Sequence, residues 1–190
     1  MSKGFYHFLR EAWKKPDSIR LRELMIEWRA QEAVIKVEKP LRLDKARSLG
    51  YKAKKGYIIA RIRVLRGGRK RSKINKGRRS KRQTVRKTLK MSYRWVAEQR
   101  AQKKFPNLEV LNSYFVGKDG KNYFYEVILI DYSKPEIIND SVINWITKKT
   151  NQNRVYRGLT SAGKKSRGLR SKSPMNKSRP SVGAGLGRGK

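Results

Sequence analysis

Apolar and polar residues alternate along residues 58 to 65. The even-numbered residues are all apolar and would share one face of a strand: Ile58, Ala60, Ile62 and Val64. The opposite face carries Arg61 and Arg63 between Ile59 and Leu65. Because side chains of a strand point alternately to its two faces, we predict a strand with one apolar face in a core and one largely basic face.

A hairpin is predicted over residues 108 to 131. Two runs rich in β-branched and aromatic residues flank Asp119 and Gly120, a dipeptide that suits a tight turn with positive φ. Residues 127 to 130 are apolar on both faces, which indicates a central strand that is covered on both sides. With residues 58 to 65, the hairpin gives a small antiparallel sheet of at least three strands.

Helical spacing of apolar residues predicts helices near residues 4 to 14, 18 to 32 and 88 to 104. The second would begin at Asp17 or Ser18 and bury a stripe made of Leu21, Leu24, Met25 and Trp28. In the third we expect Tyr93 and Trp95 in the core. Residues 34 to 37 form either a short strand or an extended exit before Pro40. The fold class is therefore α+β, with helices covering the sheet.

Positive charge is concentrated in blocks. The 190 residues include 50 Lys and Arg but only 14 Asp and Glu, for a net charge of +36. Residues 42 to 104 carry 25 basic and 2 acidic residues, and residues 148 to 190 carry 13 basic residues and no acid. A solvated surface normally mixes both signs, so these blocks indicate a polyanionic partner.

The charge blocks also predict the domain organisation. We expect an α+β body over residues 1 to 147, interrupted by a basic loop at 66 to 87, followed by a basic irregular extension at 148 to 190. Residues 67 to 87 contain almost no apolar side chain and should be disordered without a partner. In the body, Asp140 is expected to cap a short turn whose apolar residues close one end of the core.

The sequence contains few residues that could bind a metal or catalyse a reaction. The chain has no Cys and one His, His7, so we expect neither disulfides nor a histidine or thiolate metal site, and no cofactor. Glu126 and Asp131 are taken as surface or salt-bridge groups, not a nuclease pair. No apolar run is long enough for a transmembrane helix and no leader peptide is evident, so we expect a cytoplasmic protein without membrane or small-molecule ligands.

Residues 158 to 164, GLTSAGK, nearly form a phosphate-binding P-loop. The match fails at Lys165, where a Ser or Thr would hold magnesium, and no buried strand or helical pattern flanks the segment. Nucleotide hydrolysis is therefore rejected. Exposed amides, small hydroxyl side chains and lysines here would still suit the phosphates of a nucleic acid backbone.

Four stretches together carry a family resemblance: GYKAKKGYIIARIRVLRGGRKR, LNSYFVGKDGKNYFYEVILID, WITK and RGLTSAGKKSRGL. In this order they resemble the L-fifteen-e family of archaeal and eukaryotic large-subunit ribosomal proteins, over nearly all of residues 1 to 170. The short tail and plain basic composition favour an archaeal member. The resemblance implies a structural ribosomal protein, not an enzyme, with a mixed α/β body whose basic loops and C-terminal extension enter large-subunit ribosomal RNA beside neighbouring ribosomal proteins.

Composition independently favours RNA, because basic disordered segments can fold into clefts of a preformed RNA. Two other classes stay open: a DNA-compacting, chromatin-type protein, and a basic nuclease or RNA-modifying enzyme, for which the acids are too scattered. The residues expected to contact RNA phosphates are Arg42, Lys45, Arg47, Lys52, Lys54, Lys55, Arg61, Arg63, Arg66, Arg69, Lys70, Arg71, Arg78, Arg79, Arg82, Arg157, Thr160, Ser161, Lys164, Lys165 and Arg167.

Overall fold

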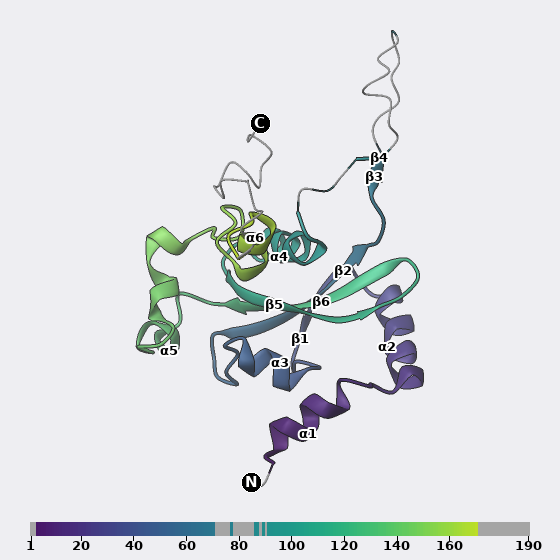
Figure 1. Ribbon diagram of the computed structural model, residues 1–190. Coiled ribbons are helices and arrows are strands. Elements are labelled where there is room, and N and C mark those ends of the chain that lie inside the picture. The colour runs from purple at the N-terminus through teal and green to yellow at the C-terminus, as the bar shows by residue number, and fades with distance from the viewer. Residues whose placement is uncertain (1–2, 71–76, 78–85, 88, 90, 171–190) are drawn as a thin grey trace.

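A four-stranded antiparallel sheet forms the centre of the protein (Figure 1). The computed structural model describes residues 3–70, 77, 86–87, 89 and 91–170. Across the sheet, the strands are β1 Val34–Val37, β2 Tyr57–Leu65, β6 Asn122–Ile130 and β5 Glu109–Lys118. The predicted α+β class with at least three antiparallel strands is confirmed. Residues 34 to 37, for which two conformations were open, form an edge strand.

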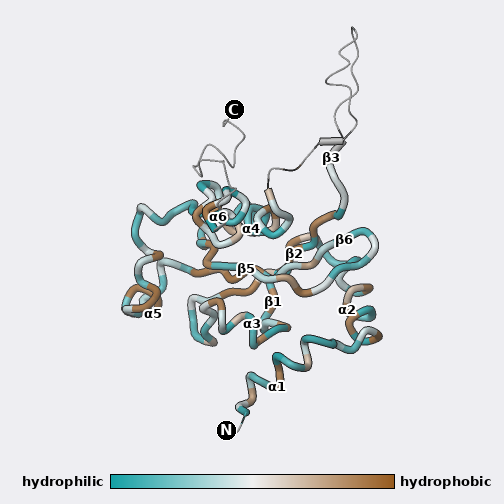
Figure 2. Tube along the Cα trace, viewed as in Figure 1, coloured by the Kyte–Doolittle hydropathy of each residue, from teal (hydrophilic) through white to brown (hydrophobic). Residues whose placement is uncertain are grey.

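The two faces of the sheet are covered by different helices. On one side α4 (Tyr93–Lys104) buries Trp95 and Ala97 against Ala60, Ile62 and Val127. On the other side, α2 (Ser18–Ala30) and the short α3 (Leu43–Ser48) pack on the remaining face, with α1 (Phe5–Ala12) beyond them. Apolar colour runs along the central strands in Figure 2, while the loops around them are hydrophilic. The even-numbered face of β2 therefore lies in the core beside α4, as predicted, whereas the opposite face is not open to solvent, because Ile59 is buried on the α2 side.

Both predicted long helices are present. Capping side chains fix their first residues, which the spacing of apolar residues alone does not determine. The carboxylate of Asp17 accepts a hydrogen bond from the backbone N–H of Ile19 at 2.9 Å and begins α2, as expected. The hydroxyl of Ser92 accepts one from the N–H of Trp95 at 3.3 Å. Helix α4 therefore begins at Tyr93, five residues after the predicted start, because a side-chain cap fixes the first turn.

The β5–β6 hairpin is confirmed, but its turn works differently from the prediction. Gly120 does not have a positive φ. Instead, the Asp119 carboxylate accepts hydrogen bonds from the backbone N–H groups of Lys121, at 2.7 Å, and Asn122, at 2.5 Å. The side chain of Asp119 therefore closes the turn, and the left-handed conformation that glycine usually supplies is not needed.

One end of the core is closed by residues 131 to 151, which include the turn after Asp140 that was predicted there, although Val142 of this turn is exposed. Short elements follow β6 here: α5 Pro135–Ile138, η2 Asn144–Thr147 and η3 Lys149–Asn151. They bury Ile137, Ile143 and Ile146 against Ile130 at the end of β6. Asp140 accepts a hydrogen bond from the Val142 N–H at 3.0 Å, which is the turn cap expected there.

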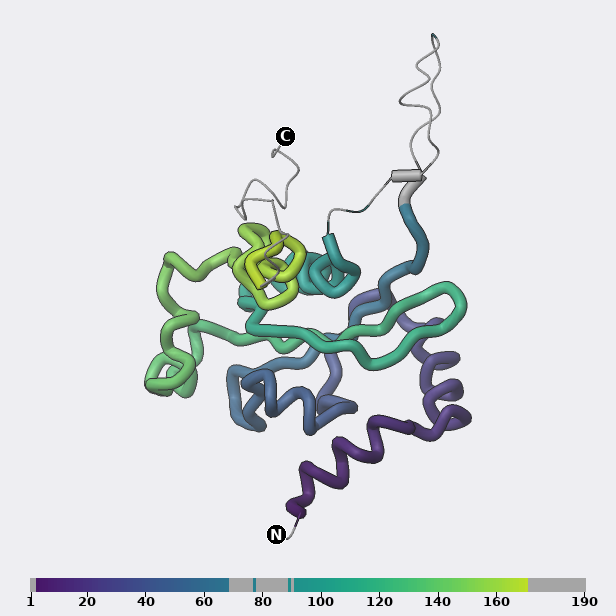
Figure 3. The backbone as a smooth tube through the Cα atoms, viewed as in Figure 1, coloured from purple at the N-terminus to yellow at the C-terminus, as the bar shows by residue number. Residues whose placement is uncertain are grey.

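The chain then folds back on α4. We call residues 154–169, which include α6 (Ser161–Ser166), the clasp; Figure 3 shows it coiled beside α4. Val155 and Ala162 are buried in the α4 side of the core, and the indole Nε1 of Trp95 donates to the Val155 carbonyl at 2.7 Å. An irregular extension from residue 148 was expected, whereas residues 148–170 lie folded. We therefore propose that they belong to the body.

Two glycines allow the clasp to cross itself closely. A Cβ atom on Gly163 would lie 2.7 Å from the Cα of Gly158, and one on Gly158 would lie 2.7 Å from the Cδ of Arg167. Gly158 also has a φ of +65°. Only glycine fits two backbones at this separation.

The predicted basic loop 66–87 lies mostly outside the described residues. Its described ends form a two-stranded antiparallel pair, β3 (Arg69–Lys70) with β4 (Arg86–Lys87). This pair leaves the body on the same side of the sheet as α4 and α6 (Figure 1). The hydroxyl of Tyr93 donates to the carbonyl of Gly67 at 2.6 Å and ties the base of the loop to α4.

Candidate nucleic-acid interface

The two arginines of β2 contact the protein itself. Arg61 lies over the Trp28 ring, with 4.4 Å from Cζ to the ring centre, and donates to the Gln31 side chain at 2.7 Å. The guanidinium of Arg63 donates to the Arg29 carbonyl in the last turn of α2. Cations at a helix C-terminus complement the free carbonyls there. The basic face of β2 was expected to contact RNA, yet its guanidinium groups hold the end of α2.

Lysines of the loop at residues 49–56, which we call the lysine loop, are partly paired. Lys52 and Lys54 both contact the Asp140 carboxylate, at 2.8 and 2.6 Å. These hydrogen bonds lower the pKa of Asp140 far below its usual range. Lys55 is exposed, and no ion pair or hydrogen bond to its ammonium group occurs among the described residues. Of the three lysines predicted to contact RNA in this loop, Lys55 is therefore the one whose ammonium group is not already paired with Asp140.

Two arginines of the segment before the lysine loop face α1. Arg42 pairs with Asp44 at 3.4 Å and lies 4.9 Å from the centre of the Trp13 ring. Arg47 lies 5.5 Å from the centre of the Tyr6 ring and is exposed on its other side. These contacts join α1 to α3, while Lys45 on the same helix is exposed.

In the clasp, three of the residues predicted to contact RNA have partners within the fold. Thr160 is fully buried, and its hydroxyl donates to Glu98 at 2.6 Å and accepts from the Gly163 N–H at 3.2 Å. Arg167 is 9% exposed and donates to the Gly158 carbonyl at 3.0 Å. Arg157 is exposed but donates to the Gln152 carbonyl at 2.8 Å. The near P-loop is therefore the start of α6, where the Thr160 hydroxyl caps the helix and already accepts the N–H of Gly163.

Several predicted cations do point outward. Lys164 and Lys165 are exposed on α6, and Ser161 is half-buried at its first position. Arg66 is exposed at the end of β2. Arg69 and Lys70 lie in β3, whereas the remaining predicted contacts lie outside the described residues: Arg71, Arg78, Arg79 and Arg82.

A basic hollow of about 390 Å³ lies at the ends of β1 and β2. It is lined by Arg29, Ala33, Arg63, Leu65, Arg100, Lys121 and Asn122. Its four cations come from α2, β2, α4 and the hairpin turn, and no acid lines it. The guanidinium of Arg100 donates to the Arg63 carbonyl at 3.1 Å, which holds α4 against this end of β2. Such a hollow suits a phosphate group.

Three of the cations that line this hollow were not among the predicted RNA contacts. They are Arg29, Arg100 and Lys121. The first two lie in predicted helices and the third in a predicted turn, where a single basic residue is typical of any protein surface. Only the tertiary fold brings them together. The one available signal was the absence of an acid between residues 99 and 108, next to Arg100.

Two acidic residues are fully buried, which corrects the prediction for Glu126. This residue, expected as a surface or salt-bridge group, is 0% exposed and accepts hydrogen bonds from the Tyr114 hydroxyl, at 2.5 Å, and the Leu41 N–H, at 3.2 Å. Burial raises the pKa of Glu126. Glu98 is equally buried beside Ser113 and Thr160, and burial raises its pKa too. Neither carboxylate is accessible for catalysis on a macromolecule.

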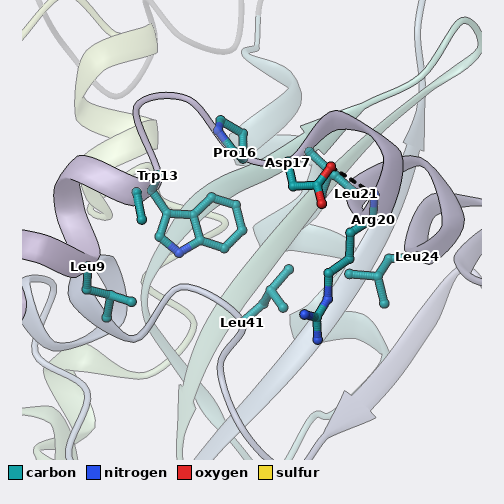
Figure 4. Close-up of a pocket in the computed structure, with 9 residues that line it drawn as sticks. Leu9, Trp13, Pro16, Asp17, Arg20, Leu21, Leu24 and Leu41 are labelled. Atoms are coloured by element: carbon teal, nitrogen blue, oxygen red, sulfur yellow. Dashed lines mark hydrogen bonds between the residues drawn. The ribbon is translucent and has the colours of Figure 1, made fainter.

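A second hollow, of about 500 Å³, is largely apolar (Figure 4). Leu9 of α1 and Trp13, which follows this helix, face Leu21 and Leu24 of α2 across it, with Leu41 between them. Within the described ranges, no group of three metal-ligating side chains occurs. The helices described are all too short or too polar to cross a membrane.

Comparisons with known proteins place the sequence in a family. The family model described as Ribosomal L15 (L15e) matches residues 4–184. The "Large ribosomal subunit protein eL15" of Methanospirillum hungatei is 48% identical over 196 aligned positions, which cover all of both chains. The protein of the same name from Methanocella arvoryzae is 50% identical, also over all of both chains. The chain therefore belongs to the L15e family of ribosomal proteins.

Proposed function

We propose that this protein is a structural constituent of the large ribosomal subunit, in the cytoplasm, where it binds ribosomal RNA and neighbouring ribosomal proteins and catalyses no reaction. The full-length similarity to proteins named for that subunit is the observation that carries the proposal. The distribution of charge within the fold supports it.

The acids of the body are largely used internally. Asp119 and Asp140 cap turns, while Glu98 and Glu126 are buried. Asp140 and Asp119 also pair with Lys52, Lys54 and Arg29, so these acids offset only a few of the cations. Lys45, Lys55, Lys164 and Lys165 are exposed, and the basic hollow collects four more cations where the 66–87 loop begins. Phosphates of a folded RNA are the partner that such a surface fits best.

Co-sedimentation tests the assembly. We expect the tagged full-length protein to remain with large ribosomal subunits on a gradient whose salt concentration removes loosely held proteins. Sedimentation with free protein, or with chromosomal DNA, would contradict the proposal and favour the DNA-compacting alternative.

Salt dependence tests which lysines contact phosphates. For a ribosomal RNA fragment, the Lys164→Gln/Lys165→Gln double variant should reduce the slope of log K against log salt by about 0.7–0.9 for each lysine that contacts a phosphate. Lys52→Gln is the matched control, because Lys52 is exposed but already paired with Asp140. Equal slopes for the wild type and the double variant would exclude these two lysines from the interface.

A further inference from the structure

Four aromatic side chains form a continuous patch where the β5–β6 hairpin extends past the first turn of α4. They are Tyr93, Phe115, Tyr123 and Tyr125. The ring centres of Tyr93 and Tyr123 are 5.0 Å apart, and Phe115 lies 5.8 Å from Tyr125 and 6.3 Å from Tyr123. Phe115 meets both neighbours edge to face, at 68°. We call this cluster the aromatic patch.

Phe115 leaves the patch open to solvent. Its exposed fraction is 40%, whereas Tyr125 beside it is 8% exposed and lies in the core. The exposed ring of Phe115 therefore adds an aromatic surface to a protein face that also carries cations. Tyr123 and Tyr125 both contact the Phe115 ring and support it from within the sheet.

A β-bulge brings cations onto the same face. Phe115 pairs with Tyr125 and Lys118 pairs with Tyr123, with a register shift between Phe115 and Gly117. Paired residues of antiparallel strands point to the same face. Phe115 and Lys118 are three residues apart and would point to opposite faces of a regular strand, but the bulge places both on the same face. Arg66 lies over the Tyr123 ring, at 5.1 Å, and completes a cationic border.

Acids do not balance this border. Asp119 follows Lys118 in the chain, but its carboxylate is bound by the N–H groups of the turn and lies 3.7 Å from Arg29. The patch also lies between the two parts of the body that carry the proposed RNA contacts. Tyr93 is bonded to Gly67 at the base of the 66–87 loop, and the Ser92 N–H donates to the Ser166 hydroxyl of α6 at 3.2 Å.

We propose that the aromatic patch is a stacking site for one unpaired nucleobase of the bound RNA, with the base on Phe115 and its flanking phosphates near Arg66 and Lys118. This inference rests on the proposed function and adds a base-contacting site to it. Aromatic rings beside cations match a nucleotide, which offers a π-face and an anion together. An apolar protein segment would match the ring but not the cations.

The test uses the full-length protein and two fluorescent ten-residue probes: oligoadenylate RNA, and an abasic ribose-phosphate strand with the same charge. Anisotropy titrations should show tighter binding of oligoadenylate by the wild type. Phe115→Ala and Phe115→Leu should each weaken oligoadenylate binding about fivefold to a hundredfold, the range for loss of one stacked base, and leave the abasic strand unaffected. Phe115→Trp should retain the wild-type affinity.

Ile138→Ala is the matched control, because Ile138 is 49% exposed on α5, outside the aromatic patch, and should change neither affinity. Near-ultraviolet circular dichroism checks that each variant is folded; if the alanine variant is not, the leucine variant decides. Wild-type affinity in Phe115→Leu would show an apolar contact and overturn the stacking site. Equal wild-type affinity for both probes would also overturn it while leaving backbone binding intact, whereas failure to bind either probe would contradict the proposed function itself.

Discussion

The clasp and the lysine loop are similar in composition but use their cations differently. Both are basic, lack acids and were expected to contact phosphates. In the clasp, Arg154 and Arg167 donate to backbone carbonyls of Val110 and Gly158, and both lie largely inside the fold. In the lysine loop, Lys52 and Lys54 reach one carboxylate at the surface.

The difference follows from the two side chains. The planar guanidinium of arginine offers several donors and tolerates partial burial, whereas the lysine ammonium is strongly hydrated and remains at the surface. Basic residues of equal charge can therefore have structural or ligand-binding roles. The comparison teaches that charge counts alone do not separate the two, and that substitutions in the clasp should affect stability most.

The largest expected effect comes from Gly163→Ala. Its new Cβ would lie 2.7 Å from the Gly158 backbone, which cannot rotate away. We expect a loss of about 3 kcal/mol in the free energy of unfolding, at the upper end for overpacking. Gly120→Ala is the control, since nothing lies within 4 Å of its Cβ position. Urea unfolding measures both; equal midpoints would mean that the clasp is not packed as described.

Removing the Arg167 guanidinium should have the next largest effect. Arg167→Met keeps the apolar stem but leaves the Gly158 carbonyl without its donor, and we expect a loss of about 2 kcal/mol. Lys165→Met, on the exposed side of α6, should remain within about 0.5 kcal/mol of the wild type. The same unfolding experiment applies. If the lysine variant were the less stable of the two, the assignment of roles in the clasp would be wrong.

A smaller effect concerns the buried acid beneath the clasp. Because burial raises the pKa of Glu98, the folded state keeps its proton to higher pH than the unfolded chain does. Its contribution to stability is therefore full below the ordinary pKa, about 4.3, and declines as pH rises through the raised value. Glu98→Gln cannot lose a proton and should show a weaker decline. Parallel stability curves for the two proteins would contradict the raised pKa.

The smallest effect on stability is expected at the lysine loop, and its dependence on pH has the opposite sign to that of Glu98. The pKa of Asp140 is lowered, so its pairing with Lys52 and Lys54 stabilises the fold above the ordinary range for Asp and is lost as pH falls through the lowered value. Asp140→Asn should differ little from the wild type in high salt and should lack this acid-dependent loss. Thermal melts at low and high salt measure it; a salt-independent difference would indicate a buried contact.

Local pattern predicted the parts of the fold that depend on local rules. The alternation in β2, the hairpin and the stripe on α2 each follow from the side-chain period of one element. The clasp was missed because it has no period: it buries single residues, Val155 and Ala162, and is held by hydrogen bonds to distant carbonyls. Segments without periodicity but with well-placed glycines can still be folded.

The candidate interface was predicted less completely for a related reason. The roles of Arg61 and Arg63 depend on where α2 ends, and the burial of Glu126 depends on Leu41 and Tyr114, which are far from it in the chain. Sequence shows how many cations exist, whereas the tertiary structure determines which ones already have partners.

The strand order has a consequence for how the chain folds. Strand β2 lies between β1 and β6, and even its nearest pair, Leu65 with Asn122, joins residues on either side of the basic loop and α4. A nascent chain therefore carries β2 with one edge unpaired until β6 has been synthesised, and closing so long a loop slows folding. A polyanion that gathered the intervening cations would shorten that search, so the partner of the mature protein would also speed its formation.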